Sequence, residues 1–117
     1  MRVEADAHRV QQVIGNLIGN AVKYGAPGAA IEVRVEGRIG EAAVAVTNKG
    51  RGIDAAEMER IFNPFARSDA PEKQAVPGLG LGLYICKGIV EAHGGAISAQ
   101  SVPGETTTIL FTLPAAP

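Results

Sequence analysis

Three glycines alternate with three leucines near the middle of the chain, in the order Gly78-Leu79-Gly80-Leu81-Gly82-Leu83. Glycine allows a backbone to approach a ligand closely. The helix-like stretch 84–93 that follows would direct its free N–H groups and positive dipole end at these glycines, which favours an anion. The run therefore predicts a phosphate cradle anchored by leucines, or, more simply, a hinge with close helix–strand contact. It has neither the closing Lys-Ser/Thr of a P-loop nor the spacing of a dinucleotide fingerprint.

A second polar group lies on the first expected helix. Asn16, Asn20 and Lys23 stand at i, i+4 and i+7, so they form one stripe beside the apolar face of the helix. Amide oxygens are hard, neutral ligands that suit Mg²⁺, and a lysine can meet a phosphate. A solvated helix face is the alternative, although asparagine is a poor helix former and two in mid-helix call for a reason.

A third polar group ends the expected central strand, with the order Asn48-Lys49-Gly50-Arg51-Gly52. A side chain at a strand end, followed by two glycines, is in a position to contact a nucleotide base. The alternative is a plain turn to the next helix. Phe62 and Phe65 flank Pro64 before a polar segment, and we expect them to anchor that segment in a small core.

Helical and alternating patterns place these residues on an α+β fold. Asp6 begins a helix that runs to about residue 24, and Asp54 with Glu57 forms a capping box for a helix to about residue 61. Gly94-Gly95 ends the third helix. The predicted strands are 31–36 with one wet face, 42–47, 96–101, 107–113, and the tail of a strand at 2–4. Three helices and about five mixed, mostly antiparallel strands predict a two-layer α/β sandwich with a mobile loop at 66–77.

Composition sets limits on the class of protein. The 117 residues suit one domain, 1–117, and a net charge of −1 gives no sign of a nucleic-acid or membrane surface. The single cysteine excludes an internal disulfide and fits a reducing compartment. No apolar run has the roughly 20 residues of a membrane span. We expect a cytoplasmic, monomeric domain excised from a longer protein whose membrane anchoring stays open.

Four motifs in order resemble the ATP-binding catalytic domain of sensor histidine kinases. They are Asn16-x-x-x-Asn20, Asn48-x-Gly50-x-Gly52, Phe62-x-x-Phe65 and Gly78-x-Gly80-x-Gly82, and the resemblance covers essentially the whole chain. It implies the Bergerat fold shared with DNA gyrase and MutL, with ATP between the helix layer and a lid at 66–77. In this family, ATP and Mg²⁺ serve transfer of the γ-phosphate within a two-component phosphorelay.

The resemblance also implies roles for individual residues. Asn16 and Asn20 would hold Mg²⁺ and the phosphates as catalytic residues, with Lys23 on the phosphate side and Tyr24 on the base side. Asn48, Gly50 and Gly52 would surround the base. The glycine–leucine run would hold the phosphates, Arg67 is a weaker candidate for the γ-phosphate, and Thr107 would also contact the nucleotide.

Two positions depart from the family pattern. Asn48 stands where most members carry an Asp that reads adenine. A neutral amide accepts more weakly than a carboxylate, and its NH₂ can face a guanine oxygen, so we predict weak binding and relaxed preference for ATP over GTP. Thr106 replaces a glycine that usually follows Gly104-Glu105, which leaves the last glycine box degenerate.

The chain also lacks a phosphoacceptor, because neither His8 nor His93 is followed by an acidic residue. The resemblance therefore implies a partner hairpin domain that carries the histidine, a response regulator downstream, and no autophosphorylation by this chain alone. Hydrolytic relatives place a water-activating Glu where Asn16 stands. An amide cannot take that proton, so we predict slow ATP hydrolysis.

Three other functions stay open. Asn48 and Thr106 favour a degenerate nucleotide-sensing or docking module. A serine kinase of the anti-sigma type is disfavoured by the Phe62–Phe65 motif and the long lid. A purely structural sandwich leaves the asparagines and the glycine run unexplained.

Overall fold

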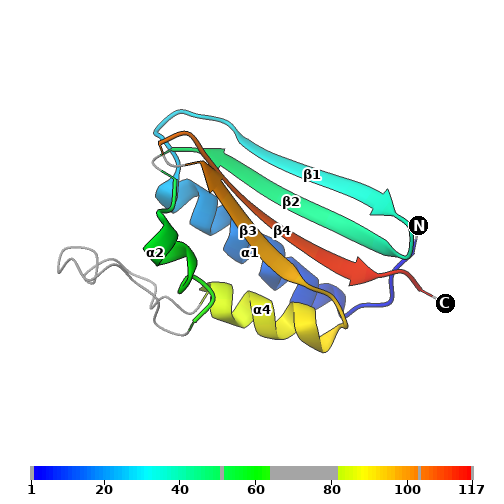
Figure 1. Ribbon diagram of the computed structural model, residues 1–117. Helices are drawn as coiled ribbons and strands as arrows, with labels where there is room; N and C mark the ends of the chain where they lie inside the picture. The colour runs from blue at the N-terminus through cyan, green and yellow to red at the C-terminus, as the bar shows by residue number, and fades with distance from the viewer. Residues whose placement is uncertain (1, 51, 64–81, 103, 117) are drawn as a thin grey trace.

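The described part of the chain forms one antiparallel sheet with helices on one face (Figure 1). The computed structural model describes residues 2–50, 52–63, 82–102 and 104–116. Its elements, in chain order, are α1 (Ala7–Tyr24), β1 (Ile31–Arg38), β2 (Glu41–Lys49), α2 (Ala55–Met58), α4 (Gly82–Ala92), β3 (Ile97–Val102) and β4 (Thr106–Pro114). The two-layer α+β architecture is therefore confirmed.

The sheet has the strand order β1-β2-β4-β3, and every ladder in it is antiparallel. The described residues contain four strands, one fewer than the predicted number of about five, and the mostly antiparallel pairing was predicted correctly. The missing strand is the one predicted at 2–4, which is not in a ladder. A backbone hydrogen bond links this segment to the other end of the chain, because Ala116 N–H donates to the Arg2 carbonyl at 2.6 Å.

The core lies between the two long helices and the inner face of β2 and β4. Leu17 of α1, Val90 of α4 and Phe111 of β4 are each no more than 1% exposed. The helical repeat predicted for α1 supplies this apolar stripe, and its start is confirmed. The Asp6 carboxylate accepts from the backbone N–H groups of His8 and Arg9 at 3.0 and 3.2 Å.

The edge strand β1 differs from expectation. Its alternation predicted one buried face, yet only Ile31 is half-buried, while Val33 and Val35 are 46% and 69% exposed. Helix α1 packs chiefly over β2, and only a little of it reaches β1. The pattern identified the strand correctly, but the apolar face of an edge strand is buried only where a helix covers it.

Two helix boundaries also differ from the sequence prediction. The Asp54 carboxylate caps α2 by accepting from Glu57 N–H at 2.8 Å, but the helix ends at Met58 instead of residue 61. Arg60 N–H bonds to the Glu57 carbonyl, so the chain tightens from α-helical to i→i+3 bonding. Helix α4 begins at Gly82, which makes the last glycine of the run a helical residue.

Candidate functional site

The two asparagines of the stripe lie on α1, the helix that packs against α4. Asn16 and Asn20 are both half-buried, one helical turn apart. Burial raises the pKa of the Cys86 thiol in α4 to about 11, and a hydrogen bond with the Asn16 side chain acts in the opposite direction. The Cys86 thiol also donates to the Val13 carbonyl of α1 at a sulfur–oxygen distance of 3.8 Å, so this part of α1 adjoins α4. Lys23 follows in the last turn of α1 and is exposed.

The second part of the site is a pair of buried polar residues on the two central strands. Asn48 of β2 and Thr107 of β4 are partners in register, so both face the helix layer. They are 3% and 2% exposed. Among the described residues, the Asn48 Nδ2 has no hydrogen-bond partner. Thr107 differs, because its hydroxyl lies 3.2 Å from Ser101 Oγ.

The end of α1 is joined directly to the end of β2. Ala26 N–H donates to the Lys49 carbonyl at 2.6 Å, and Gly25 forms a β-bridge with Gly50. A Cβ on Gly25 would lie 2.5 Å from the Ala21 carbonyl and 3.6 Å from Asn48 Cβ. Only glycine therefore permits this approach without a shift of the backbone. The junction brings the last turn of α1 and Asn48 to one end of the sheet.

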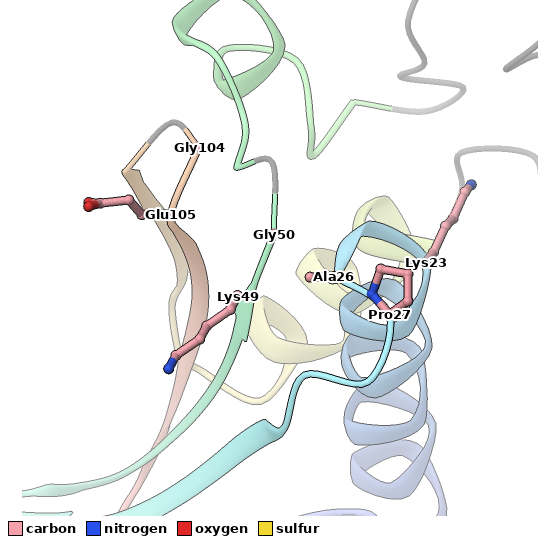
Figure 2. Close-up of a pocket in the computed structure, with 8 residues that line it drawn as sticks. Lys23, Ala26, Pro27, Lys49, Gly50, Gly104 and Glu105 are labelled. Carbon is pink, nitrogen blue, oxygen red and sulfur yellow. The ribbon is translucent and has the colours of Figure 1, made fainter.

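An open cleft of about 660 Å³ lies at this junction (Figure 2). Its lining comes from three connections that are far apart in sequence, and consists of Lys23, Gly25, Ala26, Pro27, Lys49, Gly50, Gly104 and Glu105. Figure 2 shows the Lys23 and Lys49 side chains extending in opposite directions, so the two ammonium groups do not converge. The lining thus combines small residues with three charged side chains, Lys23, Lys49 and Glu105.

The turn after β2 is fixed by glycine and by one serine. Gly52 is buried and has a φ of +76°, which L side chains rarely adopt. The next N–H, that of Ile53, donates to Ser101 Oγ at 2.7 Å, and Ser101 in turn donates to the Thr106 carbonyl at 2.9 Å. This network ties the turn to the ends of β3 and β4. The glycine was expected from the sequence; the serine was not.

The structure brings together part of the set predicted from sequence. Asn16 and Asn20 share one flank of α1, Asn48 and Thr107 share one end of the sheet, and Lys23 and Gly50 line the cleft. Gly82 and Leu83 open α4, where Leu83 packs against the core. Arg67, the lid at 66–77, Pro64, Phe65 and residues 78–81 (Gly78, Leu79, Gly80 and Leu81) lie outside the described residues. So does the side chain of Tyr24.

Sequence reasoning missed the other residues of the cleft wall. Gly25, Ala26 and Pro27 were assigned to a loop, and Gly104 and Glu105 to a turn. A glycine directly after the last helical turn was the one available signal, because it allows a close approach to the following element. The contact of that loop with the end of β2 depends on tertiary packing.

The described residues hold no group of three or more His, Cys, Asp and Glu side chains that could bind a metal ion. In the same part of the chain, no helix is long and apolar enough to cross a bilayer.

Residues 5–117 match the family described as histidine kinase-, DNA gyrase B- and HSP90-like ATPases, and the chain belongs to this family. It is 40% identical over 114 residues to the sensor histidine kinase WalK of Bacillus subtilis, and 38% identical over 109 residues to the sensor protein SrrB of Staphylococcus aureus. These alignments cover 96% and 93% of this chain. The chain spans only 19% of the length of each of these two relatives.

The chain also resembles solved structures of histidine kinases. The catalytic domain of ThkA in a nucleotide-free form matches with a TM-score of 0.82 and 33% identity, over 98% of this chain and 73% of that one. A mycobacterial sensor histidine kinase, MprB, matches at 0.84 and 32%, over 98% and 78%. The resemblance drawn from the motifs is confirmed, and the chain is an ATPase domain of the histidine-kinase type.

Proposed function

We propose that this chain binds Mg-ATP and donates the γ-phosphate to a histidine on a separate phosphoacceptor hairpin of a sensor kinase. The observation that carries the proposal is the site at one end of the sheet. At that end, the buried Asn48 Nδ2 has no hydrogen-bond partner among the described residues, and α1, which carries the half-buried Asn16 and Asn20, joins β2 there. The family match supports a nucleotide as the ligand. ShkA, similar at a TM-score of 0.84 and 29% identity over 97% of this chain and 23% of that one, was solved in complex with AMPPNP.

The proposal gives a role to the main predicted site residues that the structure describes. The amide oxygens of Asn16 and Asn20 would hold Mg²⁺, which neutralises phosphate charge when bound. Lys23, at the cleft, would meet a phosphate oxygen, and the free N–H groups at the start of α4 favour an anion there. Asn48 and Thr107 would face the base. Phosphoryl transfer depends mainly on such positioning and charge neutralisation.

The chain would keep the phosphate for a partner instead of releasing it to water. Asn16 offers an amide, which cannot act as a base at neutral pH. Its thiol neighbour Cys86 has a raised pKa and stays protonated. We therefore expect slow ATP hydrolysis, with a response regulator receiving the phosphate after the hairpin histidine. Turnover similar to that of hydrolytic relatives would contradict this assignment.

The central test is a titration of ATP with and without Mg²⁺ in wild type, Asn20→Ala and Gln11→Ala. Gln11 is an exposed amide on the same helix and serves as the matched control. We expect Mg²⁺-dependent binding in wild type and Gln11→Ala, and at least a tenfold loss in Asn20→Ala, as for removal of an interaction worth about 1.4 kcal/mol. If the wild type binds ATP with the same affinity in the presence and absence of Mg²⁺, the proposal is contradicted.

A second assay distinguishes a kinase from a nucleotide-sensing module. The γ-phosphate of labelled ATP should appear on the hairpin domain of the parent protein when that domain is added. Mg²⁺-dependent binding without transfer would favour the module, a reading supported by the neutral Asn48 and by Thr106, which is paired in β4.

A further inference from the structure

The Asn48 side chain carries a hydrogen-bond donor that is held away from water. It is 3% exposed, and Nδ2 has no partner among the described residues. A buried donor left unpaired costs about 1–3 kcal/mol. Such a group in a native fold calls for a partner, and a bound ligand is one that can supply it.

The neighbouring groups are already engaged. Across the ladder, the Thr107 hydroxyl lies 3.2 Å from Ser101 Oγ, which itself receives Ile53 N–H and donates to the Thr106 carbonyl. Gly25 lies nearby, since a Cβ added to it would be 3.6 Å from Asn48 Cβ. Among the described residues, the neighbouring hydroxyls therefore leave no acceptor for Nδ2, and a bound ligand can supply one.

An amide presents one acceptor and two donor hydrogens side by side. In one orientation it accepts from the 6-amino group of adenine and donates to N1. Turned by 180°, it donates to the 6-oxo group of hypoxanthine or guanine and accepts from N1–H. A carboxylate in the same place could only accept.

We infer that Asn48 makes the base site accept both 6-aminopurine and 6-oxopurine nucleoside triphosphates. This inference rests on the proposed function, because it assumes that the nucleotide base meets Asn48. The inference adds the substrate class, which is purine nucleoside triphosphates with either an amino or an oxo group at position 6 of the purine ring. The unpaired Nδ2 is the group that would donate a hydrogen bond to the 6-oxo oxygen.

The test compares ATP with inosine triphosphate, which differs from ATP only in the 6-oxo group and the N1–H that accompanies it. Both are titrated with Mg²⁺ into wild type and Asn48→Asp. We expect wild-type affinities within about threefold of each other. In Asn48→Asp, we expect ATP to be favoured by about tenfold or more, the size of one hydrogen-bond difference.

The outcomes separate this inference from the proposed function. If wild type binds ATP but discriminates against inosine triphosphate as strongly as Asn48→Asp, the inference fails and the proposed function stands. If wild type binds neither nucleotide, both fail. Should Asn48→Asp not fold, the side-chain NH₂ signals of Asn48 in wild type decide instead. They should shift with both nucleotides, and a shift with ATP alone would overturn the inference.

Discussion

The middle and the end of the β2–β4 pair share one face of one sheet, yet they have opposite character. In the middle, Val44 pairs with Phe111 and Val46 with Ile109, and all four are buried and apolar. One step further along the same face, Asn48 pairs with Thr107, equally buried but polar. The strands therefore contribute stability along most of their length. The candidate recognition residues lie at one end, where polar side chains occupy buried positions that are apolar elsewhere in the pair.

The largest effect should come from the middle of the pair. Phe111 is 1% exposed and packs in the core with α1 and α4, so Phe111→Ala should lower the free energy of unfolding by about 3–5 kcal/mol. Urea unfolding followed by circular dichroism measures this. Val35→Ala on the exposed edge strand is the control, with a change within about 0.5 kcal/mol. Equal losses at both positions would remove the distinction between core and edge.

At the polar end, the sign of the effect should reverse. Asn48→Leu removes a buried unpaired donor at nearly constant volume, so nucleotide-free stability should rise by about 1–3 kcal/mol. Nucleotide affinity should fall in the same variant. Asn63→Leu makes the same change at an exposed position and should leave stability within about 0.5 kcal/mol. A destabilised Asn48→Leu would mean that this amide has a structural partner.

Thr107 should give a smaller loss, since its hydroxyl is paired. Thr107→Val keeps the shape and removes the 3.2 Å contact with Ser101, which should cost about 0.5–1.5 kcal/mol in thermal or urea unfolding. Thr106→Val is the matched control, because Ser101 bonds to the carbonyl of Thr106. If the control loses as much stability as Thr107→Val, the hydroxyl contact is not the cause.

The smallest effect at neutral pH should come from Cys86, behind the asparagine stripe. Burial raises its pKa to about 11 from the ordinary 9.0, so the folded chain holds the thiol proton more tightly than the unfolded chain does. This contribution to stability is complete below pH 9 and is lost as the pH rises from 9 toward 11. Urea midpoints of wild type and Cys86→Ala at pH 8 and 10.5 measure it. An unchanged difference between the two proteins would contradict the raised pKa.

Sequence alone predicted the elements that depend on local pattern. The α1 helix, its Asp6 cap, four of the strands and the order of the motifs follow from periodicity, capping chemistry and spacing. The exposure of Val33 and Val35 was not predictable, because it depends on which strands a helix covers. Nor does capping chemistry at Asp54 show where α2 ends.

The candidate site was predictable as a list of residues but not as a surface. Asn16, Asn20 and Asn48 were identified by type and position. The unpaired state of Asn48 depends on the ladder partner opposite it and on what the neighbouring hydroxyls already bind. Similarly, the cleft joins three connections that only the folded sheet brings together.

The ring of His93 provides a built-in spectroscopic reporter of how the two long helices are docked. Its Nε2 accepts from Asp6 N–H at 3.1 Å, at the start of α1, and Nδ1 lies 2.8 Å from the Ile89 carbonyl in α4. Both contacts together require the Nδ1–H tautomer. The only other histidine, His8, is exposed and gives an internal reference. Imidazole ¹⁵N shifts therefore report, in one spectrum, whether the entry to α1 stays attached to α4 when a ligand binds at the opposite end of these helices.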